Sequence, residues 1–288
     1  MGFAAGRLVL ITGATNGIGL AAAEELAARG ARLAIVARSE AKADDAVARI
    51  RRAGGDGATV DVLIADLASQ ASVRRLAAAA LESYPRIEVL VNNAGAIHER
   101  RELTEDGVER TWAVNHLAPF LLTGLLLERL RESAPARFVT TASDAHRGAR
   151  KLPLDDPRAE RSYRTRGFGR YGETKLANIL FTKELARRLE GSGVTANCFH
   201  PGLVASGFNR NNGALMSAAM MLVKPFSRSP RRGAETLVWL GDSPDVPGSG
   251  GYFVDMKLAT PASAAQDMAA ARRLWEVSEE QTRPAAVS

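Results

Sequence analysis

Leu8-Val9-Leu10-Ile11 and the turn that follows it, Thr12-Gly13-Ala14-Thr15-Asn16-Gly17-Ile18-Gly19, decide the fold of this 288-residue chain. The stretch is an apolar strand that leads through a glycine-rich turn straight into a helix predicted over residues 17–29. Glycines at such a turn let backbone N–H groups approach a pyrophosphate, which also lies at the positive end of the helix. We therefore predict a dinucleotide site that comprises Gly13, Thr15, Asn16, Gly17, Ile18 and Gly19.

Apolar runs and helical segments alternate along the rest of the chain. We expect strands at residues 8–11, 32–37, 60–64, 87–91, 137–141, 194–199 and 252–255. Helices are expected at residues 17–29, 40–52, 72–83, 103–130 with a break near Pro119, 171–190 and 233–240. The strands are almost continuously apolar, as in a parallel sheet covered on both faces. This order predicts an α/β fold with a doubly wound, Rossmann-like parallel sheet of seven strands.

No Pro/Gly/Ser linker interrupts the alternation, so residues 1–288 are expected to form one domain. Two irregular stretches, residues 145–170 and 205–232, are long enough to be binding loops or lids. The last residues, 281–288, are expected to fray.

The composition is that of an ordinary globular protein, with 46% hydrophobic and 24% charged residues. The single cysteine, Cys198, excludes an intramolecular disulfide and is expected to be a buried thiol. The chain shows no signal peptide, and the apolar run at 120–127 is too short to span a membrane. We expect a cytoplasmic protein without a membrane span.

The net charge of +6 gathers partly in one segment. Between Arg147 and Arg170 there are eight basic and three acidic side chains. A solvated arginine-rich loop is the favoured interpretation, and an anionic partner is the alternative. Nucleic-acid binding would need aromatic or base-reading residues among the charges, and the segment lacks that pattern, so no nucleic-acid partner is expected.

Arg38 and Ser39 end the second predicted strand, where an acidic residue would bind the ribose hydroxyls of NAD. A guanidinium at this place can pair with the 2′-phosphate of NADP, and Ser39 can add a hydrogen bond. NADP(H) is therefore the predicted cofactor, and NAD(H) remains the alternative.

The spacing T-G-x-x-x-G-x-G resembles that of the short-chain dehydrogenase/reductase family, and the resemblance extends along most of the chain. It implies an adenine contact at Asp66 and Leu67, after the third strand. The segment Asn92-Asn93-Ala94-Gly95 matches the family's N-N-A-G, which implies that Asn93, Ala94 and Gly95 line the adenine-ribose region. Pro201 and Gly202 match a segment that lies near the nicotinamide in the family.

Tyr171 and Lys175 are four residues apart on a predicted helix, so their side chains share one face. Carbonyl reduction needs an acid that protonates the developing alkoxide, and a nearby ammonium is expected to lower the pKa of the tyrosine. Ser143 follows the fifth strand at the edge where such sheets bind ligands, so its hydroxyl can hold the substrate oxygen.

In the family, an asparagine at the position of Asn115 supports a water that relays protons to the lysine, and the lysine also holds the nicotinamide ribose. The resemblance thus implies a catalytic tetrad of Asn115, Ser143, Tyr171 and Lys175. The four histidines lack the spacing of metal ligands, so no metal is expected.

The gap between Ser143 and Tyr171 is longer than is usual in the family, which resembles the retinol dehydrogenase-like branch and marks residues 145–170 as an insertion. Residues 205–232 occupy the place of the family's substrate lid, and the alternative is an amphipathic helix packed on the core or on another subunit. Methionines in this segment suit an apolar ketone, aldehyde or alcohol. An NAD-dependent alcohol dehydrogenase and a non-catalytic dinucleotide sensor remain alternatives, and a homo-oligomer is possible.

Overall fold

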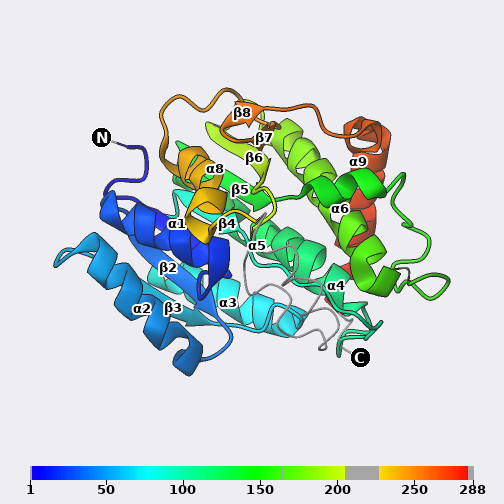
Figure 1. Ribbon diagram of the computed structural model, residues 1–288, viewed down its shortest axis with the longest axis horizontal. Coiled ribbons are helices and arrows are strands. Elements are labelled where there is room, and N and C mark those ends of the chain that lie inside the picture. The colour runs from blue at the N-terminus through cyan, green and yellow to red at the C-terminus, as the bar shows by residue number, and fades with distance from the viewer. Residues whose placement is uncertain (1, 164, 205–226, 285–288) are drawn as a thin grey trace.

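A sheet in the strand order β3-β2-β1-β4-β5-β6-β7-β8 forms the centre of the computed structural model, which describes residues 2–163, 165–204 and 227–284 (Figure 1). Strands β1 to β7 pair in parallel, which confirms the predicted fold class. They are β1 (Leu8–Thr12), β2 (Arg32–Ala37), β3 (Val60–Ile64), β4 (Val89–Asn92), β5 (Ala136–Thr141), β6 (Val194–His200) and β7 (Tyr252–Val254).

An eighth strand, β8 (Lys257–Leu258), was not expected from the sequence and pairs antiparallel with β7. Asp255 and Met256 connect the two strands with φ angles of 49° and 61°. Two successive positive φ angles make a tight hairpin turn, for which glycine or asparagine is the usual signal. Neither residue is present here, so no local signal indicates that the strand ends at Val254.

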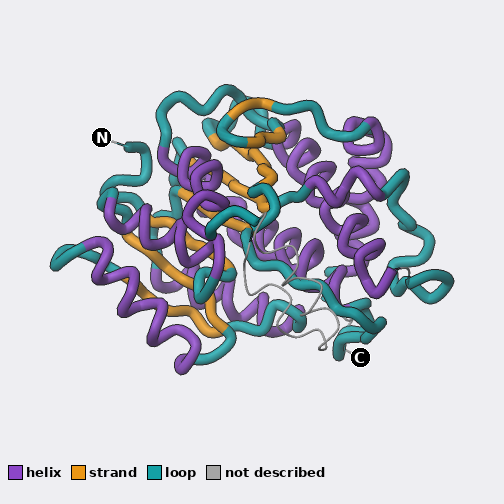
Figure 2. The backbone as a smooth tube through the Cα atoms, in the orientation of Figure 1, coloured by secondary structure: helices purple, strands orange, loops and turns teal. Residues whose placement is uncertain are grey.

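Helices cover both faces of the sheet (Figure 2). They are α1 (Gly17–Ala28), α2 (Glu40–Gly54), α3 (Gln70–Ser83), α4 (Arg110–Trp112), α5 (Ala118–Glu132), α6 (Phe168–Arg188), α8 (Pro230–Asp242) and α9 (Met268–Gln281). Alternate residues of a strand point to opposite faces. Accordingly, Val9 and Ile11 pack in one core with α1, α2 and α8, while Leu8 and Leu10 pack in the other with α3 and α5.

The helix expected over residues 103–130 begins only at Arg110, because Leu103 pairs with Glu109 in an isolated β-bridge. After α4 the chain widens into a π-helical turn, Ala113–Leu117, before α5 begins. Pro119 lies in the first turn of α5 and has no N–H to offer a preceding carbonyl. The expected break near Pro119 is therefore a change of helix type within a continuous helical segment.

The C-terminal helix α9 was not predicted from the sequence, and its last residue, Gln281, is held in place. The Gln281 carbonyl accepts a hydrogen bond of 2.8 Å from the Gln70 side chain, and its Oε1 accepts one of 3.0 Å from the Trp112 indole. Fraying at Gln281 is thus a wrong expectation, because long-range side-chain contacts hold this residue. Residues 285–288 lie outside the described part.

The structure describes the first of the two irregular stretches almost completely and the second only at its ends. In 145–170, short 3-10 turns and hydrogen bonds to the Asp156 carboxylate shape the chain, and α6 already begins at Phe168. Most of the expected lid, residues 205–226, lies outside the described residues. Its two flanks lie side by side, since Val204 pairs with Arg228 in a parallel bridge.

Candidate active site

The carboxyl ends of β1 and β4 mark the centre of the site. These strands are neighbours, and the chain leaves β1 toward α1 on one face and β4 toward α5 on the other. Such a reversal opens a crevice at the strand ends, where open α/β sheets bind ligands. The candidate residues that follow β1, β2, β3, β4, β5 and β6 all lie along this edge of the sheet.

The glycine turn after β1 has no room for side chains at two positions. A Cβ on Gly19 would lie 2.3 Å from the Gly13 carbonyl oxygen and 2.4 Å from Asn93 Nδ2. Gly13 has a φ of 68°, a left-handed conformation, and a Cβ there would lie 2.8 Å from Ala94 Cα. The exposed Asn16 precedes α1 without a side-chain hydrogen bond to the helix start, so the first-turn N–H groups suit an anion.

Thr12 and Asn93 fasten this turn to the segment after β4. Thr12 Oγ1 accepts hydrogen bonds of 3.1 Å from the N–H groups of Asn93 and Ala94. In return, Asn93 Nδ2 donates to the Thr12 carbonyl at 3.0 Å and to the Gly13 carbonyl at 3.2 Å. The Asn93-Ala94-Gly95 segment is thereby held against the predicted phosphate loop.

Arg38 and Ser39 are both exposed at the carboxyl end of β2, and Ser39 is the N-cap residue directly before α2. Within the described residues, no carboxylate forms an ion pair with Arg38. The guanidinium therefore lies at the expected strand end with no internal acid to neutralise it.

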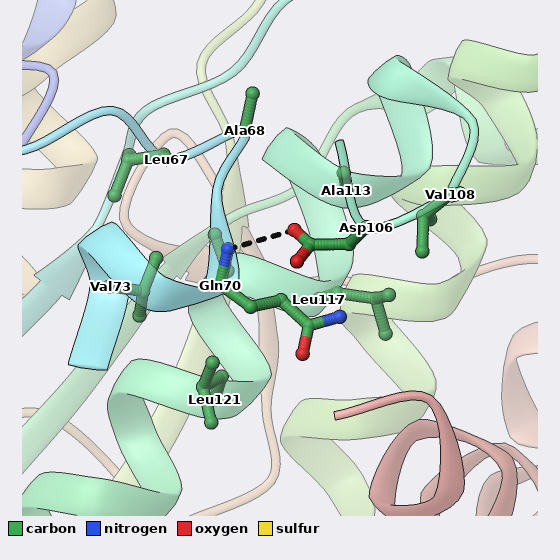
Figure 3. A pocket seen from close by; sticks show the side chains of 10 residues that line it. Leu67, Ala68, Gln70, Val73, Asp106, Val108, Ala113, Leu117 and Leu121 are labelled. Atoms are coloured by element: carbon green, nitrogen blue, oxygen red, sulfur yellow. Dashed lines mark hydrogen bonds between the residues drawn. The ribbon is translucent and has the colours of Figure 1, made fainter. Parts of the chain in front are cut away.

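Asp66 and Leu67 differ in their surroundings. Asp66 is exposed, and its Oδ1 accepts a hydrogen bond of 3.0 Å from the Ala68 N–H. Leu67 packs against the core and lines a cavity of about 10 Å³ near the start of α3 (Figure 3). Figure 3 also shows the Gln70 N–H donating to Asp106 at the rim, over 2.9 Å. A space of this size holds about one water molecule, so this cavity is not a substrate pocket.

Tyr171 and Lys175 lie on one face of α6, as predicted, with Lys175 Nζ 5.4 Å from the centre of the tyrosine ring. The ammonium donates a hydrogen bond of 2.9 Å to the Thr141 carbonyl. Burial raises the pKa of Tyr171 to about 12, although the Ser143 hydroxyl hydrogen-bonds the tyrosine and opposes this rise. Burial also lowers the pKa of Lys175 to about 8. The expected lowering of the tyrosine pKa is thus wrong here, because desolvation outweighs the opposing hydrogen bond from Ser143.

Ser143 reaches Tyr171 from the end of β5. Its carbonyl accepts a hydrogen bond of 2.7 Å from the buried imidazole of His146, whose other nitrogen accepts one of 3.0 Å from the Ala262 N–H. Because Nε2 accepts, the proton must reside on Nδ1, so the ring is the neutral tautomer that can donate to Ser143. The sequence offered no signal for this support, since His146 and Ala262 are 116 positions apart.

Asn115 is fully buried in the π-helical turn. Its Oδ1 accepts a hydrogen bond of 2.7 Å from the Ala96 N–H, and its Nδ2 donates to the Ala96 carbonyl at 2.8 Å. The same Nδ2 donates to Thr174 Oγ1 at 3.1 Å, next to Lys175 in the chain. The structure thus gathers the four predicted catalytic residues, with Thr141 and Thr174 as links that sequence reasoning missed.

Pro201 and Gly202 follow β6 as expected and are half-buried. Gly202 has a φ of 81°, and a Cβ there would lie 2.7 Å from the Arg228 side chain. Arg228 in turn forms an ion pair with Asp255, with Nη2 and Oδ2 3.0 Å apart. This glycine is therefore needed where the chain enters the expected lid.

The arginine-rich insertion carries several ion pairs. Arg161 lies 2.7 Å from Asp155, and Arg166 lies 2.8 Å from Glu99. Such pairs between exposed side chains contribute little stability, but they offset part of the segment's positive charge. These exposed ion pairs agree with the interpretation of the arginine-rich segment as a solvated loop.

Three further expectations concern the rest of the described chain. Cys198 is buried, as predicted, and burial raises the pKa of its thiol to about 12. Among residues 2–163, 165–204 and 227–284, His, Cys, Asp and Glu side chains form no group of three or more suited to a metal ion. None of the helices described combines the length and the apolar character that crossing a membrane requires.

Comparisons with known proteins agree with this geometry. The family described as short chain dehydrogenase matches residues 7–152. Retinol dehydrogenase 14 of Mus musculus is 43% identical over 287 residues, covering 95% of this chain and 85% of the relative. Retinol dehydrogenase 12 of Homo sapiens is 42% identical over 276 residues, with the same coverage of 95% and 85%.

Solved structures give the same result. An uncharacterized protein from Mycobacterium paratuberculosis superposes with a TM-score of 0.75 at 33% identity, covering 96% of this chain and 94% of the other. A short chain dehydrogenase from Burkholderia cenocepacia, solved in complex with NADP, has a TM-score of 0.68 at 26% identity, covering 92% and 99%. This chain belongs to the short-chain dehydrogenase/reductase family, resembles its retinol dehydrogenase branch, and is an oxidoreductase acting on CH–OH and C=O groups.

Proposed function

We propose that this protein transfers a hydride between NADP(H) and an apolar ketone or aldehyde, or the corresponding alcohol. The observation that carries the proposal is the cluster of Ser143, Tyr171 and Lys175 at the same edge of the sheet as the glycine turn. A dinucleotide fits this edge of the sheet, because the turn is too tight for side chains at Gly13 and Gly19 and the start of α1 favours phosphate. When bound, the nicotinamide supplies or accepts the hydride.

Each catalytic side chain has a role that its surroundings support. Tyr171, with a pKa of about 12, is protonated at neutral pH and donates its proton to the substrate oxygen during reduction. Ser143 orients that oxygen by hydrogen bonding, and Lys175, whose pKa is about 8, is mostly cationic near neutral pH and stabilises the tyrosinate that results. Oxidation of an alcohol follows the same steps in reverse.

Asn115 is the fourth residue of the proposed site, and it contacts no reacting group directly. Both ends of its amide hold Ala96, and Nδ2 also holds Thr174 on the helix of the catalytic pair. We assign Asn115 two roles. It supports the proton relay to Lys175, and it maintains the spacing between the π-helical turn and α6.

The preference for NADP(H) rests on Arg38. A guanidinium at the end of β2 can pair with a 2′-phosphate in a two-pronged geometry, whereas NAD would be favoured by a carboxylate at this place. The NADP complex of the Burkholderia relative agrees with this preference.

An apolar substrate is proposed because large apolar side chains are exposed next to site residues in the chain. Phe168 is 44% exposed and precedes Tyr171 by one helical turn, and Leu203 is 49% exposed directly after Gly202. Exposed apolar side chains around a few polar groups are typical of sites for apolar ligands. A cytoplasmic location and a possible homo-oligomer remain predictions.

The test is a titration of the purified protein with NADPH and with NADH, followed by nicotinamide absorbance with a panel of apolar carbonyls. We expect tight NADPH binding and turnover, with a higher kcat/KM for NADPH than for NADH. A higher kcat/KM for NADH would refute the cofactor assignment. Binding of NADPH without turnover on the whole panel would contradict the proposed substrate class.

A further inference from the structure

Arg170, the residue before the catalytic tyrosine, is only 2% exposed. Its Nε lies 2.9 Å from Glu109 Oε2, its Nη1 lies 3.1 Å from Glu173 Oε2, and its Nη2 donates to the Pro157 carbonyl. The guanidinium also stacks on Trp112, 4.6 Å from the ring centre. A buried arginine is costly unless it is paired throughout, and here every guanidinium nitrogen has a partner.

Glu109, the main partner, is 0% exposed and stands at the start of the segment that carries Asn115. Its Oε1 accepts a hydrogen bond of 2.8 Å from the Thr111 N–H, and its Oε2 accepts one of 2.9 Å from the Trp112 N–H. A carboxylate in this position fixes where a helix begins. The ion pair therefore joins the beginning of one catalytic segment to the beginning of the other.

The insertion between Ser143 and Tyr171 completes the same network. The Tyr163 hydroxyl donates a hydrogen bond of 2.7 Å to the His98 carbonyl and lies 3.4 Å from Glu109 Oε1. Gly167 approaches the same carbonyl so closely that a Cβ would lie 2.0 Å from its oxygen. His98 lies two residues after Ala96, which holds the Asn115 amide, so the insertion also supports the segment that contacts Asn115.

We propose that Arg170 and Glu109 are positioning residues, which hold the helix bearing Tyr171 and Lys175 in register with the turn bearing Asn115. The insertion contributes through the Pro157 carbonyl, which binds Arg170, and the Tyr163 hydroxyl, which binds His98. Its role is therefore to order the reacting centre. The inference rests on the proposed function, because it assigns these residues an effect on turnover. The predicted phosphate loop lies elsewhere, at the start of α1, so we expect loss of the pair to reduce turnover more than cofactor binding.

The test compares Arg170→Met, Glu109→Gln and their double variant with the parent enzyme. We expect kcat to fall at least about tenfold while the KM for NADPH stays within about threefold, since small displacements of catalytic groups cost much turnover. Arg170→Lys, which keeps the charge, should recover part of kcat. If Arg170→Met alone fails to fold, the double variant decides, because removal of both charges leaves neither buried and unpaired.

Arg187→Met is the matched control. Arg187 lies on the same helix and pairs with Glu184, which keeps Arg188 as a second partner. This variant should retain the kcat of the parent. Unchanged kcat in folded Arg170→Met and double variants, or an equal loss in Arg187→Met, would overturn the inference.

Hydrogen exchange separates this inference from the proposed function, because it needs no substrate. Arg170→Met should raise amide exchange in residues 110–117 as well as in 168–175, whereas Arg187→Met should leave 110–117 unchanged. If the parent shows no turnover, the proposed function fails and the exchange result alone decides the coupling. Unchanged amide exchange in residues 110–117 of Arg170→Met would refute the coupling between this segment and α6.

Discussion

Backbone atoms shape the nucleotide end of this site, whereas paired side chains from distant positions shape the reacting end. At the glycine turn, the contacts of Gly13 and Gly19 leave no space for a Cβ, and the neighbouring Arg38 is exposed. Around Tyr171, a buried ion pair links Glu109 to Arg170 across 61 positions of sequence. We conclude that changes at the first end should act on cofactor binding, and changes at the second should act on turnover.

Among the variants at Ser143, Gly19 and Arg38, the largest effect is expected for Ser143→Ala. Without the hydroxyl that contacts Tyr171 and orients the substrate oxygen, kcat should fall on the order of 10²- to 10³-fold, as for other lost donors to a developing oxyanion. The dissociation constant of NADPH should change little. Steady-state kinetics and a binding titration measure the two quantities. Ser143→Thr, which restores a hydroxyl, should recover activity, and equal losses in both variants would argue against the assigned role.

Gly19→Ala tests the other end. Its Cβ would overlap the Gly13 carbonyl, and relieving such an overlap costs about 1–3 kcal/mol, so NADPH should bind about 10- to 100-fold more weakly. Gly124→Ala in α5 is the control, because a Cβ there meets nothing within 4 Å. That variant should keep the affinity of the parent. Equal NADPH affinity in Gly19→Ala, measured by fluorescence titration, would contradict the described turn.

Arg38→Ala tests how the nucleotide end distinguishes NADPH from NADH. Loss of one exposed charge-assisted contact should weaken NADPH binding about tenfold and leave NADH binding unchanged. The ratio of the two dissociation constants is the measurement. Arg32→Ala, an exposed arginine at the opposite end of β2, serves as the control. An equal effect on both cofactors would mean that Arg38 does not contact a 2′-phosphate.

Lys175→Met should change how stability depends on pH. The folded pKa of Lys175 is about 8, against 10.5 as its ordinary value, so between these pH values only the unfolded chain holds the proton. Stability of the parent should therefore rise with pH relative to the variant, by at most roughly 1.4 kcal/mol per pH unit. Urea unfolding across this interval measures the difference. Lys42→Met, at an exposed lysine of α2, should show the slope of the parent.

The sequence predicted the nucleotide end better than the reacting end for a physical reason. Glycines and the end of a strand carry local signals, so the turn after β1 and the position of Arg38 could be expected. The four catalytic residues could be named from their spacing and from a family resemblance. Their supports could not, since Thr141, Thr174 and His146 act through a backbone carbonyl, a side chain and an imidazole whose partners depend on the tertiary fold.

Two errors in the fold have the same origin. The anchored Gln281 depends on contacts with Gln70 and Trp112, which no local pattern announces. Helix α9 itself carries a local signal, because the Asp267 side chain accepts hydrogen bonds from the N–H groups of Ala269 and Ala270 at its start, and the sequence prediction missed it. The helix expected from residue 103 begins at Arg110 because the preceding residues form a bridge. At Gln281 and at Arg110, tertiary contacts determine where the ordered segment ends or the helix begins.

A single-turnover experiment on Tyr171→Phe tests whether Tyr171 donates the proton during carbonyl reduction. Parent and variant are saturated with NADPH and mixed with an apolar carbonyl that the parent reduces, and oxidation of the bound cofactor is followed by absorbance. We expect equal NADPH affinity in the two proteins and an oxidation rate on the order of 10²- to 10⁴-fold lower in the variant, the usual contribution of a general acid. Oxidation at the parent rate would contradict the assignment of Tyr171 as the proton donor.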